Sequence, residues 1–146
     1  MSTEETRRLA HHHQETLNRA FSTGNLDLLD ATTAADFVEH NPSPGPGGGS
    51  ALVNWKQSLG WLKLSFPDMQ FNVEQIIADG DKAVVHVTIA GTHRGDAMGV
   101  PATGKVVAMP AIDILRFEGG KVVEHWGVYD ELSMLRQLGL APQPGA

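Results

Sequence analysis

One pair of residues in the C-terminal half has the types needed for proton transfer. Two stretches typical of β-strands flank Glu118-Gly119-Gly120, and a three-residue loop there, with a glycine in the left-handed conformation, predicts a hairpin. In that register Asp113 faces His125 on the neighbouring strand. A carboxylate bonded to an imidazole fixes its tautomer and raises its basicity, which predicts His125 as a general base and Asp113 as its orienting partner or the acid. The alternative is a structural Asp–His pair in the core or at a subunit interface.

Seven further residues are candidates for contact with a ligand. Three share a strand face with the Asp–His pair, and three aromatic residues lie on predicted helices, where they are either core residues or pocket walls. The last is a histidine just before a Pro/Gly-rich loop, where a substrate contact and a surface position fit equally well. In this order they are Leu115, Gly127 and Tyr129, then Phe21, Trp55 and Trp61, then His40.

The sequence predicts neither a metal nor a cofactor. It has no cysteine, so thiolate catalysis and disulfides are excluded. His40, His86, His93 and His125 are scattered without the paired spacing of a zinc site. No phosphate-binding loop, dinucleotide fingerprint or serine-nucleophile motif occurs, so nothing indicates a nucleotide.

The elements that must position these residues fall into two halves. Apolar residues at helical spacing predict helices first, and a period-two pattern then predicts strands joined by hairpins. Helices followed by hairpins are typical of an α+β domain with helices on one face of an antiparallel sheet. We expect one domain, residues 1–146, with a flexible Pro/Gly loop at 42–49. The predicted helices are 3–21, 26–32, 50–66 and 131–138, and the predicted strands lie at 71–76, 82–93, 105–117 and 121–129.

The faces of the last two strands indicate a partner. Odd positions such as Leu115 and Val123 and even positions such as Val122 and Val128 are both largely apolar, although a solvated face should be polar. We therefore expect helices to cover one face and a second subunit the other, as a homodimer; a monomer with an apolar outer face is the alternative.

The charge and the hydropathy narrow the class of protein. The net charge of −6 argues against a nucleic-acid partner. No apolar run approaches the roughly 18 residues of a membrane span, so no membrane partner is expected. Residues 1–8 are polar and do not resemble a signal peptide, so we expect a cytoplasmic location.

Several motifs together resemble the SnoaL-like polyketide cyclases, and they cover nearly the whole chain. They include Gly91-Thr92-His93-Arg94-Gly95, the segment 98–105, the segment 118–126 with His125-Trp126 at its end, and Leu135-Arg136-Gln137-Leu138-Gly139. The resemblance implies an NTF2-like cone, in which a curled sheet and helices enclose a deep apolar pocket and the outer sheet face forms a dimer. It also implies cofactor-free aldol cyclisation of a polyketide by a pocket aspartate.

When the family's functional residues are matched one by one to this chain, the catalytic aspartate has no counterpart. The family's acid/base Asp follows the pair that appears here as His125-Trp126, and this chain has Gly127 in its place. A His and a Gln of the family's neighbouring strand correspond to Asp113 and Ala111. We expect Gly127 to leave extra space for a bulky ligand or a water.

Two functions remain open at this stage. One is a cofactor-free enzyme acting by acid/base chemistry on an apolar, polyketide-like molecule: an aldol cyclase, a related lyase or isomerase, a dehydratase or a cofactor-free oxygenase. The other is a binding protein that kept the pocket and lost the aspartate.

Overall fold

The computed structural model describes residues 1–42, 47–97 and 99–145. The middle of the predicted Pro/Gly loop, residues 43–46, lies outside them. None of the helices in the described ranges is long and apolar enough to cross a membrane. The elements in chain order are α1 (Thr3–Thr23), a 3-10 helix η1 (Leu26–Ala31), β1 (Thr33–Glu39), α2 (Ala51–Ser65), β2 (Gln70–Asp79), β3 (Lys82–Thr92), β4 (Val106–Glu118), β5 (Lys121–Tyr129) and α3 (Glu131–Gln137).

The predicted helices are confirmed, and their ends have the expected caps. Gly24 ends α1 with a φ of 78°, a left-handed conformation that glycine adopts without strain. The Ser50 hydroxyl accepts a hydrogen bond from the Val53 amide and begins α2. Asp130 begins α3 in the same way, through the Ser133 amide.

The sheet has the strand order β1-β5-β4-β3-β2. Strands β2 to β5 form the predicted antiparallel hairpins. The expectation of a wholly antiparallel sheet is wrong, because β1 adds to the edge of β5 in the parallel direction, with Glu39 beside His125. This strand lies in a stretch that the sequence predicted only as a lead-in to the loop.

The predicted register of the β4–β5 hairpin is also wrong. The turn has two residues, Gly119 and Gly120, with φ of 60° and 80°, and a bulge at Val123 on β5 shifts the pairing between Arg116 and Phe117. As a result Leu115 faces His125, and Asp113 faces Gly127. The bulge also turns Val122 into the core, where it was predicted on the outer face.

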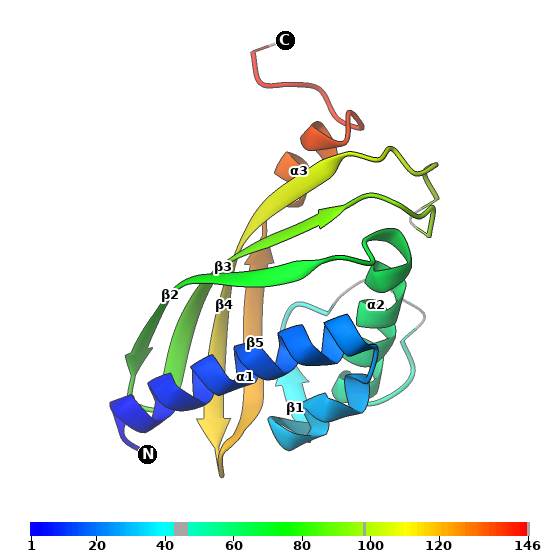
Figure 1. The fold of residues 1–146 in the computed structure, drawn as a ribbon. Helices are drawn as coiled ribbons and strands as arrows, with labels where there is room; N and C mark the ends of the chain where they lie inside the picture. The colour runs from blue at the N-terminus through cyan, green and yellow to red at the C-terminus, as the bar shows by residue number, and fades with distance from the viewer. Residues whose placement is uncertain (43–46, 98, 146) are drawn as a thin grey trace.

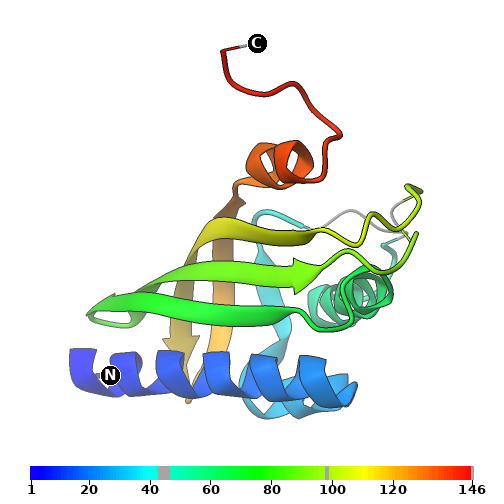
Figure 2. The same cartoon turned by 45° about the horizontal axis from the view of Figure 1, so that its top comes forward.

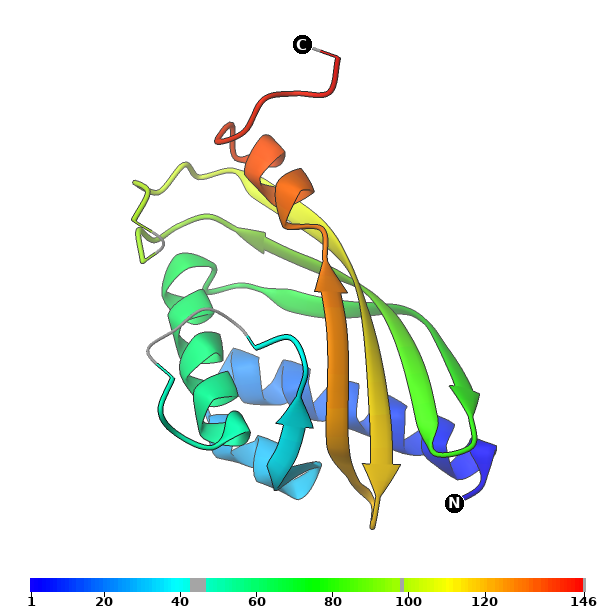
Figure 3. The same cartoon turned by 180° about the vertical axis from the view of Figure 1, so that it is seen from behind.

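The sheet curls around a hollow and stays open at its edges. Helix α1 runs across the concave side, and α2 lies beside β1 (Figures 1 and 2). From behind, β5 and β1 stand side by side next to α2 (Figure 3). This is the predicted NTF2-like α+β cone, and the concave side contains the core.

Candidate active site

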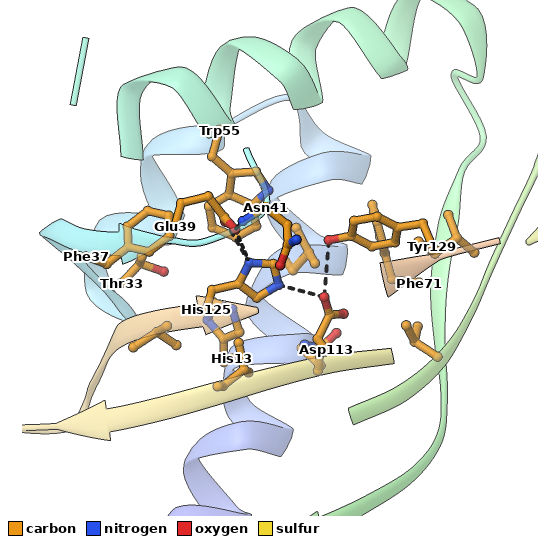
Figure 4. Close-up of a pocket in the computed structure, with 16 residues that line it drawn as sticks. His13, Thr33, Phe37, Glu39, Asn41, Trp55, Phe71, Asp113, His125 and Tyr129 are labelled. Atoms are coloured by element: carbon orange, nitrogen blue, oxygen red, sulfur yellow. Dashed lines mark hydrogen bonds and ion pairs between the residues drawn. The ribbon is translucent and has the colours of Figure 1, made fainter. Parts of the chain in front are cut away.

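A pocket opens into the concave side of the sheet, with about 650 Å³ of empty space counting the part open to solvent. Most of its wall is apolar, and a few polar groups converge in it (Figure 4). The lining residues are His13, Gln14, Leu17, Thr33, Phe37, Glu39, Asn41, Trp55, Phe71, Val87, Ile89, Asp113, Leu115, Val122, His125 and Tyr129.

His125 lies between two carboxylates. Its Nε2 is 2.6 Å from Asp113 Oδ1, and its Nδ1 is 2.6 Å from Glu39 Oε2 (Figure 4). The three side chains come from three adjacent strands: Glu39 from β1, His125 from β5 and Asp113 from β4. The predicted Asp113–His125 pair therefore forms, although a diagonal contact makes it and not the direct pairing we expected.

The two carboxylates decide the charge of His125. Burial lowers the pKa of this imidazole, but hydrogen bonds and attraction from Asp113 and Glu39 outweigh burial and raise the pKa from 6.5 to about 9. At neutral pH both ring nitrogens therefore carry protons and donate. An imidazolium has no lone pair with which to accept a proton, so in this state His125 is an acid.

Two neighbours complete the polar group. Tyr129 donates its hydroxyl to Asp113 Oδ1 at 3.1 Å, and burial, followed by the Asp113 charge, raises the pKa of the phenol, which stays protonated. Asn41 accepts a hydrogen bond from the Gly127 amide through Oδ1, at 3.0 Å. Asp113 Oδ1 thus receives two donors, while its Oδ2 has no bond to any side chain of this group.

In the part of the chain that the structure describes, no group of three or more His, Asp or Glu residues has the arrangement of a metal site. The nearest approach is the set of Glu39, His125 and Asp113, in which the carboxylates bond the imidazole.

Comparison with known proteins identifies the family. The family model described as SnoaL-like polyketide cyclase matches residues 11–138, which is most of the chain. The chain belongs to the SnoaL-like polyketide cyclases.

Two curated relatives in this family are cyclases of methyl ester substrates. Aklanonic acid methyl ester cyclase DauD of Streptomyces sp. (strain C5) is 31% identical over 128 residues, covering 82% of this chain and 75% of the relative. Nogalonic acid methyl ester cyclase of Streptomyces nogalater is 27% identical over 127 residues, covering 82% and 90%.

Solved structures extend the comparison. IdmH of Streptomyces antibioticus, a candidate polyketide cyclase, superposes with a TM-score of 0.76 at 32% identity, covering 88% of this chain and 97% of its own. AclR of Streptomyces galilaeus, a candidate hydroxylase, superposes with a TM-score of 0.81 at 29% identity, covering 97% and 89%. The SnoaL-like architecture therefore extends over nearly all of the chain.

Gly127 does not leave the extra space that we expected in this SnoaL-like protein. A Cβ at this position would lie 2.8 Å from Asp113 Oδ1, 2.9 Å from His125 Cε1 and 3.0 Å from the Tyr129 hydroxyl. These polar groups fill the volume that a side chain would need. A carboxylate is thus present beside His125, supplied by β4 and not by β5.

The other predicted binding residues divide into two sets. Trp55, Leu115 and Tyr129 line the pocket. Phe21 is fully buried in the core against Phe71 and does not line it. Trp61 is 61% exposed on the outer side of α2.

His40 also lies away from the pocket. Its Nε2 bonds Glu124 Oε2 at 2.7 Å, and its ring stacks on Trp126 with centroids 4.6 Å apart. Glu124 in turn bonds Arg116, so His40 belongs to an ion-pair network outside the pocket. Arg116 and Glu124 face each other across β4 and β5.

Sequence reasoning missed Glu39 and Asn41. No apolar/polar alternation marks residues 37–41, but in a strand the odd positions 37, 39 and 41 alternate in facing with 38 and 40. Reading that alternation would have placed the carboxylate, the amide and the buried Phe37 on one face.

Proposed function

We propose that this SnoaL-like protein is a cofactor-free enzyme that removes a proton next to a carbonyl of an apolar, polyketide-like molecule, in an aldol cyclisation or a related lyase or isomerase reaction. The observation that carries the proposal is the carboxylate–imidazolium pair of Asp113 and His125 in an apolar pocket. The names of the curated relatives, cyclases of aklanonic and nogalonic acid methyl esters, support the substrate class.

The charge of His125 reverses the roles expected from the sequence. Asp113 acts as the base, through Oδ2, because an imidazolium cannot accept a proton. The enolate attacks a second carbonyl of the same molecule, a carbon–carbon bond forms, and the new alkoxide takes the Nε2 proton of His125. The Asp113 carboxyl group then turns so that its protonated oxygen faces the now neutral Nε2, and it returns the proton to His125, which restores the starting state.

Positioned donors next to the enolate would stabilise its charge. The His125 imidazolium and the amide of Asn41 lie on the same side of the pocket as Asp113 (Figure 4). Electrostatic stabilisation of this kind is frequently the largest contribution to the rate.

The test is turnover of aklanonic and nogalonic acid methyl esters, followed by chromatography, because an aldol cyclisation changes retention without changing mass. We expect Asp113→Asn and His125→Gln each to lower kcat by about 10²–10⁴-fold, the usual value of a positioned acid or base. His86→Gln and Asp36→Asn make the same chemical changes outside the pocket and serve as controls.

Each outcome separates the candidates. If both pocket variants keep full activity, the site assignment is wrong. If the wild-type protein binds these esters without converting them, the non-catalytic binding protein is the better description.

A hydroxylase is a second candidate, favoured by the likeness to AclR. A carbanion formed next to a carbonyl could also react with O₂, so the same base would begin that reaction. Incorporation of ¹⁸O from ¹⁸O₂ into the product identifies a hydroxylase, and a product of unchanged mass identifies a cyclase or isomerase.

We also propose a cytoplasmic homodimer that pairs through the outer face of the sheet. Val128 on β5 is 74% exposed and Ile112, its partner on β4, is 49% exposed, which is unusual for a solvated sheet face. Val128→Lys is expected to yield monomers in sedimentation equilibrium, while Leu64→Lys on α2 leaves dimers. A monomeric wild-type protein at micromolar concentration would contradict this proposal.

A further inference from the structure

A second set of polar side chains lines the same pocket, from α1 and from the first residue of β1. His13, Gln14 and Thr33 are only 3%, 5% and 2% exposed, and all three lie in the pocket wall. None of them takes part in the proton transfer that we propose for Asp113 and His125.

The hydroxyl of Thr33 is the most informative of the three. Its Oγ1 is buried and has no hydrogen-bond partner within the described residues. A buried hydroxyl without a partner destabilises the folded state, so such groups are rare in native proteins. Thr33 also lines the pocket, so a turn of its side chain would let a bound molecule supply the missing partner.

His13 presents an acceptor to the same pocket. Burial and then the positive charge of His125 lower the pKa of His13 to about 4, so the ring is neutral. Its Nδ1 lies 2.9 Å from Thr32 Oγ1, and that hydroxyl lies 3.5 Å from the Leu29 carbonyl, which can only accept. If Thr32 donates to the carbonyl it accepts from Nδ1, which leaves the Nε2 of His13 as an acceptor.

We infer that His13, Gln14 and Thr33 form a subsite for an uncharged hydroxyl or enol group of the ligand. The inference rests on the proposed function, in which the pocket takes an apolar, oxygenated molecule. A hydroxyl both donates and accepts, which matches an imidazole acceptor, an amide and a threonine hydroxyl. By holding this group the subsite decides which end of the molecule lies beside Asp113.

The surrounding charges argue for a neutral group. An anion would find no cation in the subsite, because His13 is neutral. A cation would be drawn instead to Glu39 and Asp113, which flank the His125 ring.

The test compares 1-naphthol with 1-methoxynaphthalene, which has the same rings but cannot donate. Isothermal titration calorimetry is expected to show that the wild-type protein binds 1-naphthol about tenfold more tightly, the ratio that one hydrogen bond provides. Thr33→Val and Gln14→Met should reduce that preference to about twofold or less. Thr16→Val is the matched control, because Thr16 is a buried α1 residue that bonds the His12 carbonyl and does not line the pocket.

Thermal unfolding of the ligand-free protein supplies a second readout. Thr33→Val is expected to raise Tm, since the change removes an unpaired buried hydroxyl and keeps the shape. A structural role, for example through an ordered water, predicts the opposite: a lower Tm with unchanged affinity for 1-naphthol.

Two results would overturn the inference. One is a wild-type protein that binds both naphthalenes equally; the other is a Thr33→Val variant that keeps the full preference for 1-naphthol. Neither result bears on the proposed reaction, which is tested separately by turnover of the esters in the wild-type protein and in the Asp113 and His125 variants.

Discussion

His125 is held from both sides, and its two partners give it different properties. Asp113 faces the pocket and shares its Oδ1 between His125 and Tyr129. Both carboxylate oxygens of Glu39 lie within 2.8 Å of Nδ1, and Glu39 also accepts a hydrogen bond from the backbone N–H of Asn41. Glu39 therefore acts as a positioning residue, which orients the ring and keeps it charged.

Replacing Glu39 by Gln should reveal this role. The amide can still accept from Nδ1, but the negative charge is gone, so the pKa of His125 should fall from about 9 by about one unit. An NMR titration of the His125 ring protons measures the change. The alkaline limb of the pH–kcat profile should move to lower pH by the same amount.

The exposed carboxylate of Glu118, which pairs with Arg116, is the control for this variant. Glu118→Gln should leave the His125 titration unchanged. A Glu39→Gln protein with an unshifted His125 pKa would show that Asp113 alone sets the charge.

Of the three side chains that bond one another here, the sequence predicted Asp113 and His125 but not Glu39. Asp113 and His125 lie 12 positions apart on two strands joined by a recognisable turn, so a local argument finds them. Glu39 lies 86 positions from His125 and arrives through a parallel edge strand. No local pattern predicts which edge a lone strand will join.

In the β4–β5 hairpin, Asp113 and His125 meet although the predicted register is wrong. With a two-residue turn and a bulge, residue 127 and not 125 faces Asp113. His125 still reaches Asp113 because residues two apart on a strand share a face, and a long side chain spans the diagonal. The face of β5 residues beyond the bulge, including His125, was therefore predicted correctly, although their pairing partners were not.

Gly127 leaves the space in which Asp113 and His125 meet. We expect Gly127→Ala to lower kcat at least tenfold, because its Cβ would meet Asp113 and His125 at less than 3 Å and must displace one of them. Steady-state kinetics, together with circular dichroism to show an intact fold, measure the effect.

Gly60→Ala is the control for this variant. Gly60 lies within α2 with open space around the added methyl group. That variant should keep its activity and gain roughly 0.5–1 kcal/mol of stability, the helix preference of Ala over Gly. Equal activity of the wild-type and Gly127→Ala proteins would show that the pocket relaxes around position 127.

At the scale of the whole molecule, the cone brings two histidines with different charge states to one pocket. His13 comes from α1 on the concave side and is neutral, and His125 comes from the sheet and is charged. The α+β order was readable from the sequence, because helical and period-two patterns occupy separate halves. The sequence did not predict that these two rings line the same pocket, because that depends on how α1 crosses the curled sheet (Figure 2).

The two histidines make opposite contributions to the pH dependence of stability. The folded pKa of His125, about 9, exceeds the ordinary value of 6.5, so its contribution is complete below pH 6.5 and is lost as the pH rises toward 9. The folded pKa of His13, about 4, lies below 6.5, so its contribution is complete above pH 6.5 and is lost as the pH falls toward 4.

We therefore expect the free energy of unfolding to be greatest near pH 6.5 and to fall on both sides. Each histidine can contribute at most about 3.5 kcal/mol, since a shift of one pKa unit corresponds to about 1.4 kcal/mol. Urea unfolding between pH 4.5 and 9.5 measures the curve. His125→Gln should flatten the alkaline limb and also weaken the acid limb, because the His125 charge helps to lower the pKa of His13, whereas His13→Gln should flatten only the acid limb. A protein whose stability rises from pH 6.5 to 9 would contradict the imidazolium at position 125, and with it the assignment of Asp113 as the base.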